Sequence, residues 1–99
     1  MAREQASPSR NLACMEISLG QSATVVRHVA ETDTALAVGS GDMAVLGTPI
    51  LLAWLEAATV EVCGTTDTQT TVGTRVALDH PRPSAVGAEI RCTAEVAEI

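Results

Sequence analysis

A mainly apolar stretch in the middle of the chain surrounds a single carboxylate, Glu56. Thr48 suits the N-cap of a helix, Pro49 suits its first position, and Gly64 is a typical C-terminal stop. The pattern therefore predicts a helix over residues 49–63. Because this helix is apolar nearly all round, we expect it to be buried on most of its sides.

Segments of β-prone or alternating residues flank this helix. Residues 23–30 and 34–38 are β-prone and are separated by a polar turn at 31–33, while residues 71–79 and 88–99 follow strand patterns. In the last segment, alternation places four small or apolar side chains inward: Ile90, Cys92, Ala94 and Val96. Strands around one buried helix indicate an α+β fold, with an antiparallel sheet wrapped around that helix.

The chain is of the right size and composition for one small domain, with 99 residues of which 46% are hydrophobic. Residues 1–21 contain breakers and predict a flexible N-terminal leader, which leaves residues 22–99 as the domain. The sequence stops at Ile99 inside a strand pattern, without a turn.

Charge and cysteine content exclude several classes of protein. The net charge is −6 and the six basic residues are scattered arginines, which argues against nucleic-acid binding. The polar N-terminus resembles no secretory signal, and the longest apolar run is too short to cross a bilayer, so we expect a cytoplasmic protein without membrane contact. The three cysteines and two histidines have no metal-ligand spacing, so we expect buried thiols and no metal.

Three polar residues are candidates for chemistry, each with a plainer alternative. Glu56 is either on a solvent-exposed stripe of the helix or a functional carboxylate, because an unpaired charge in apolar surroundings is costly. Thr48 is either the N-cap alone or a hydroxyl that polarises a carbonyl at the helix N-terminus. His80 is either an ordinary loop histidine or a general acid and base.

These residues stand in motifs that resemble a known family. The motifs are a Gly-Thr-Pro helix start, a glutamate eight residues after the threonine, and a strand that ends in histidine before P-x-P-x-x-V-G. Over residues 22–99 the sequence resembles the fluoroacetyl-CoA thioesterase-like family of the hot-dog fold. Members of this family continue past the last strand into further strands, so the resemblance implies that the sheet is incomplete at its C-terminal end, with its last strands missing. The resemblance implies hydrolysis of a small acyl-CoA in a homodimer, with active sites at the subunit interface and no cofactor besides the coenzyme A of the substrate.

The resemblance also implies roles for individual residues. Thr48, Glu56 and His80 match the catalytic trio, with Glu56 as nucleophile or general base. Residues implied in substrate binding are Met43, Leu46, Gly47 and Arg82. The segment before the helix, GSGDMAVLG, has none of the bulky aromatics that enclose the substrate in fluoroacetate-specific members, so we expect a broader acyl preference. The alternatives are a non-catalytic hot-dog module that binds acyl-CoA or only dimerises, and a truncated inactive product.

Overall fold

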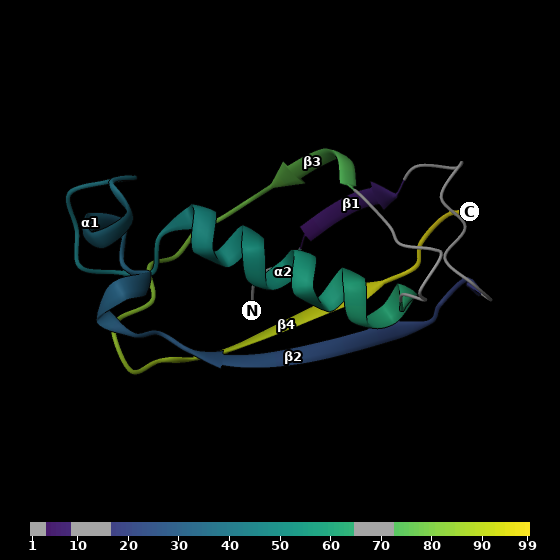
Figure 1. Cartoon of the computed structure of the whole chain (residues 1–99), viewed down its shortest axis with the longest axis horizontal. Coiled ribbons are helices and arrows are strands. Elements are labelled where there is room, and N and C mark those ends of the chain that lie inside the picture. Colours follow the sequence, from purple (N-terminus) through teal and green to yellow (C-terminus); the bar gives the residue numbers. More distant parts are fainter. Residues whose placement is uncertain (1–3, 9–16, 65–72) are drawn as a thin grey trace.

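One long helix and two antiparallel strand pairs make up most of the fold in our computed structural model, which describes residues 4–8, 17–64 and 73–99. The helix α2 (Thr48–Cys63) packs against strands from both pairs (Figure 1). The first pair is β1 (Glu4–Pro8) with β3 (Gly73–Leu78), and the second is β2 (Ser22–His28) with β4 (Glu89–Glu95). Two short helices, η1 (Glu31–Asp33) and α1 (Ala35–Val38), connect β2 to the segment before α2.

The β2–β4 pair has an uninterrupted register, from Ser22 opposite Glu95 to His28 opposite Glu89. Its alternation follows the prediction: Cys92 is fully buried, whereas Glu89 and Arg91 are exposed. Thr93 differs by being half-buried, since its hydroxyl lies 2.7 Å from that of Thr24 on the neighbouring strand. Such cross-strand pairs stabilise a sheet locally.

The core lies between α2 and the β2–β4 pair. It contains six buried side chains: Val29, Leu46, Leu51, Leu55, Ala58 and Cys92. The α2 members recur at intervals of three and four residues, so they occupy one face of the helix. Cys63 and Cys92 are buried thiols, as predicted, and Cys14 lies outside the described residues.

The predicted burial of α2 on most sides is borne out except on one face, which is exposed in the single chain. Pro49, Ala53, Glu56 and Val60 are all exposed and share the face opposite the core. The physical reason is that the covering layers are narrow, because each sheet contains two strands within the residues that the structure describes. The described residues therefore do not form the single wrapped sheet that we expected, although antiparallel pairs around one long helix are compatible with it.

The start of α2 also differs from the prediction. The N-cap is Gly47 without a side-chain cap, Thr48 is the first helical residue, and Pro49 follows it. Thr48 is not the cap because its hydroxyl points to His80 instead, at 2.8 Å from the ring nitrogen Nδ1. The predicted stop is confirmed: Gly64 has a φ of 71°, and its N–H donates to the carbonyl of Val60 at 2.7 Å.

Two further predictions are corrected. The β-prone residues 34–38 do not form a strand, because the hydroxyl of Thr34 accepts from the N–H of Ala37 at 3.2 Å and caps the helix α1. The predicted flexible leader, 1–21, contains β1, which pairs with β3. Within the described ranges, no helix combines the length and apolar character needed to cross a membrane.

Candidate active site

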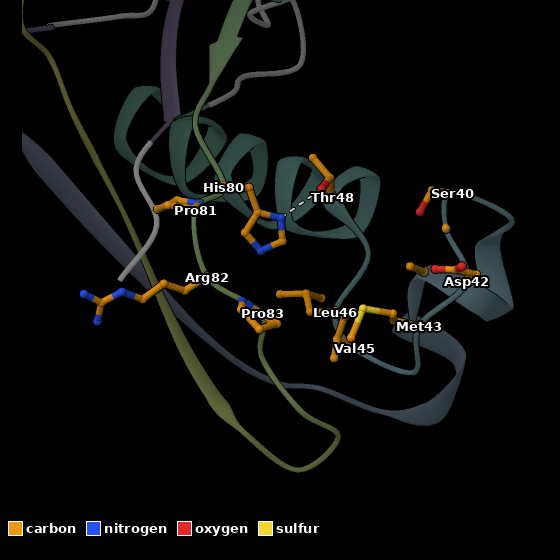
Figure 2. A pocket seen from close by; sticks show the side chains of 12 residues that line it. Ser40, Asp42, Met43, Val45, Leu46, Thr48, His80, Pro81, Arg82 and Pro83 are labelled. Carbon is orange, nitrogen blue, oxygen red and sulfur yellow. Dashed lines mark hydrogen bonds between the residues drawn. The ribbon is translucent and has the colours of Figure 1, made fainter.

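A cavity of about 280 Å³ opens at the N-terminus of α2. Its walls come from three places: α1 and the loop after it, the first residue of α2, and the proline-rich loop after β3 (Figure 2). The lining residues are Ala35, Ser40, Gly41, Asp42, Met43, Val45, Leu46, Thr48, His80, Pro81, Arg82 and Pro83.

Backbone hydrogen bonds hold the two loops of the cavity against each other. The N–H of Leu46 donates to the carbonyl of Ser84 at 2.8 Å, and Val45 forms an isolated β-bridge with Ala85. The N–H of Ala35 in turn donates to the carbonyl of Val45 at 2.8 Å. These bonds place the proline-rich loop beside the start of α2, although the two segments are far apart in the sequence.

Gly47 supports the cavity wall without lining the cavity. It is buried, and an added Cβ would lie 3.1 Å from Cγ2 of Val38, 3.2 Å from Oγ of Ser40 and 3.3 Å from Cα of Ala35. Only glycine permits this close approach without a shift of the neighbouring residues. Its position behind the cavity wall does not test the prediction that Gly47 binds substrate.

Thr48 and His80 form the polar centre of the cavity. Oγ1 of Thr48 and Nδ1 of His80 are 2.8 Å apart, and either atom can be the donor, depending on the tautomer of the ring. The backbone of His80 is restricted to extended conformations by Pro81. The side chain of His80 is half-buried, whereas that of Thr48 is exposed to solvent in the single chain.

Most backbone N–H groups at the start of α2 already have acceptors. Gly47 donates to the carbonyl of Asp33 at 2.9 Å, and both Ile50 and Leu51 donate to the carbonyl of Gly47. Pro49 has no N–H. Among the described residues, the N–H of Thr48 is thus the group at this helix end that has no backbone acceptor. It lies in the same residue as the hydroxyl that reaches His80.

Glu56 lies apart from this centre. It is two helical turns further along α2, about 12 Å by the rise of an α-helix, and it is not among the lining residues. Its side chain is exposed in the single chain, without a hydrogen bond or ion pair to any residue that the structure describes. The structure thus brings Thr48 and His80 together and leaves Glu56 on the solvent face of α2.

The other predicted site residues divide in the same way. Met43, Leu46 and Arg82 line the cavity together with Thr48 and His80. Sequence reasoning missed Ser40 and Asp42, which line the cavity from the loop after α1. The glycines around them were the available signal, because a Gly-Ser-Gly-Asp break a few residues before a helix allows a loop to fold back over the helix N-terminus.

Within the described residues, His28 and the acidic side chains do not form a second candidate site. His28 lies 3.8 Å from Glu89 across the β2–β4 pair, and both side chains are largely exposed. In the parts of the chain that the structure describes, no cluster of three histidine, cysteine or acidic residues has an arrangement able to hold a metal ion. The cavity at the start of α2 is therefore the candidate active site among the described residues.

Comparison with curated proteins and with solved structures finds no match for this chain. A family model described as FlK, fluoroacetyl-CoA-specific thioesterase, matches residues 29–99. The matched range covers most of the chain and contains the whole lining of the cavity. The resemblance drawn from the sequence motifs is thereby confirmed, and the chain belongs to the fluoroacetyl-CoA-specific thioesterase family.

Proposed function

We propose that this protein is an acyl-CoA thioesterase of the hot-dog fold, which hydrolyses a small acyl-CoA to the free acid and coenzyme A. The observation that carries the proposal is the 2.8 Å contact between Thr48 and His80 in a cavity at the N-terminus of α2. A hydroxyl, a backbone N–H and an imidazole converge there. These are the groups that acyl transfer needs for a developing oxyanion and for proton movement.

In this proposal the thioester carbonyl lies beside Thr48. The hydroxyl and N–H of Thr48 donate to the carbonyl oxygen as it gains negative charge. When His80 is the tautomer with a proton on Nδ1, it donates to Oγ1 of Thr48. The hydroxyl proton of Thr48 can then be donated to the carbonyl oxygen of the substrate. The other nitrogen, Nε2, points toward the side of the cavity lined by Leu46 and Pro83 (Figure 2), where it can accept a proton.

The hydrolysis needs no reactant besides the thioester and water. In one route Glu56 is the general base that takes a proton from water, the water oxygen forms the new bond to the carbonyl carbon, and His80 relays the proton. The bond from carbon to sulfur breaks, the coenzyme A thiolate leaves, and the proton passes to the sulfur. If Glu56 attacks first, a mixed anhydride forms and water hydrolyses it in a second step. Both routes use the same oxyanion contacts at Thr48.

The position of Glu56 supports a homodimer in this proposal. Glu56 shares the exposed face of α2 with apolar neighbours, Pro49, Ala53 and Val60. A second copy of the chain placed over this face would bury the apolar side chains and enclose the carboxylate, which would then lie at a subunit interface. The active site would be complete only in the dimer, consistent with the resemblance to the hot-dog family.

The remaining predicted contacts bind the substrate. Met43 and Leu46 provide an apolar wall for the acyl group, and Arg82 provides a cation for the phosphates of coenzyme A. Among the described residues, the cavity lining contains no Phe, Tyr or Trp side chain. We therefore propose a preference broader than fluoroacetyl-CoA.

The test is thiol release from a panel of short acyl-CoA thioesters by the purified chain, with Glu56→Gln and His80→Ala alongside. We expect release by the wild type and a loss of at least a hundredfold in each variant, with unchanged circular dichroism. Mixing the two inactive variants tests the dimer. If one chain supplies Glu56 and its partner supplies His80, random dimers regain about a quarter of wild-type activity by the symmetry of a two-fold assembly.

The alternative is a non-catalytic module that binds acyl-CoA. The exposed position of Glu56, away from Thr48 and His80, is the observation that favours it. A folded wild type that binds acyl-CoA but releases no thiol would establish this alternative. Activity that survives in both Glu56→Gln and His80→Ala would instead refute the proposed roles of these two residues.

A further inference from the structure

Two opposite charges line the cavity, and they lie on opposite sides of the Thr48–His80 pair. Figure 2 shows Arg82 extending from one side and Asp42 standing beside Ser40 on the other. Both charged side chains are exposed. The carboxylate of Asp42 has no hydrogen bond or ion pair to another residue in the described parts of the chain, so it is available to a bound molecule.

This arrangement orients an acyl-CoA in the cavity, an inference that rests on the proposed function. Coenzyme A carries several negative charges on its phosphates, which favour the Arg82 side and are repelled from the Asp42 side. With the thioester carbonyl at Thr48, the acyl group must extend away from the coenzyme. It therefore passes along Met43 toward Asp42.

We propose that Asp42 is a specificity-determining residue, which favours acyl groups with an uncharged end and rejects those that end in a carboxylate. Two like charges about 6 Å apart, at an effective dielectric constant of about 40, repel by about 1.4 kcal/mol, which is tenfold in kcat/KM. Because the carboxylate of Asp42 is exposed to solvent, the discrimination must weaken as salt is added. Acyl groups with an uncharged end are not repelled by Asp42, and they contact the apolar wall formed by Met43 and Leu46.

The experiment compares butyryl-CoA with succinyl-CoA, whose acyl groups have the same number of carbons but end in a methyl and a carboxylate. The measured quantity is the ratio of kcat/KM for succinyl-CoA over butyryl-CoA. We expect Asp42→Asn to raise this ratio about tenfold, and Asp42→Lys to raise it further. The matched control is Glu61→Gln, which removes one negative charge from an exposed position near the far end of α2 and leaves the ratio unchanged.

The ratio distinguishes repulsion by the charge of Asp42 from selection by apolar contacts, because Asp42→Asn changes the charge and leaves the apolar wall in place. A ratio that moves by less than about twofold in Asp42→Asn, or that moves equally in Glu61→Gln, would overturn the assignment while the thioesterase activity stands. If the wild type releases thiol from no member of the panel of short acyl-CoA thioesters, the proposed function itself fails. The same ratio is then measured from the Kd values of the two thioesters, and absence of binding overturns both proposals.

Discussion

Replacement of Thr48 by valine tests the catalytic role of the Thr48 hydroxyl and changes the stability of the protein only slightly. Valine has nearly the shape of threonine but lacks the hydroxyl that contacts Nδ1 of His80 at 2.8 Å. Thr48 is exposed in the single chain and does not cap α2, so its hydroxyl contributes at most the 0.5–1.5 kcal/mol of an ordinary hydrogen bond, roughly, to the free energy of unfolding. Its role at an oxyanion is worth more, about 2.7–4 kcal/mol of transition-state stabilisation.

We therefore expect Thr48→Val to lower kcat by about a hundredfold to a thousandfold, with a KM close to that of the wild type. Thr48→Ser keeps the hydroxyl and should retain most of the activity. The assay is thiol release from butyryl-CoA, with urea unfolding of each variant measured in parallel.

Thr59→Val is the matched control for this experiment. Thr59 lies on the same helix outside the cavity, and its hydroxyl donates to the carbonyl of Leu55 at 3.2 Å. The chemical change is identical, and the activity should stay at the wild-type level. A Thr48→Val enzyme whose kcat is within about threefold of the wild type would refute the oxyanion role. An equal loss in both variants would show that the effect is one of helix stability.

Two further predictions concern the scaffold that positions the site. Leu55→Ala removes a fully buried side chain between α2 and the β2–β4 pair, and we expect the free energy of unfolding to fall by about 2–5 kcal/mol, measured by urea denaturation. Gly47→Ala places a Cβ within 3.3 Å of Val38, Ser40 and Ala35, and we expect a loss of about 1–3 kcal/mol together with reduced thiol release, because the loop after α1 must move. A Gly47→Ala protein with wild-type stability and activity would show that the loop after α1 can move without altering the cavity.

The sequence correctly predicted those features of the fold that depend only on neighbouring residues in the chain. The helix end at Gly64 follows from the ability of glycine to adopt a positive φ, and the alternation of β4 follows from the two-residue period of a strand. The strand predicted over residues 34–38 failed because the cap made by the Thr34 hydroxyl outweighs the weak β preference of a short segment. The N-cap prediction for Thr48 failed because that hydroxyl has a distant partner.

The sequence by itself determined the long apolar helix, its glycine stop, the inward side of the last strand and the identity of the family motifs. Only the tertiary structure decided that Thr48 and His80, 32 residues apart, meet in one cavity, because the backbone bonds between the segments around Leu46 and Ser84 are non-local. It also decided that Glu56 faces solvent in a single chain, since exposure depends on which helix face the two narrow sheets cover. Asp42 enters the site for the same reason: a loop position acquires a role only from the surfaces that fold around it.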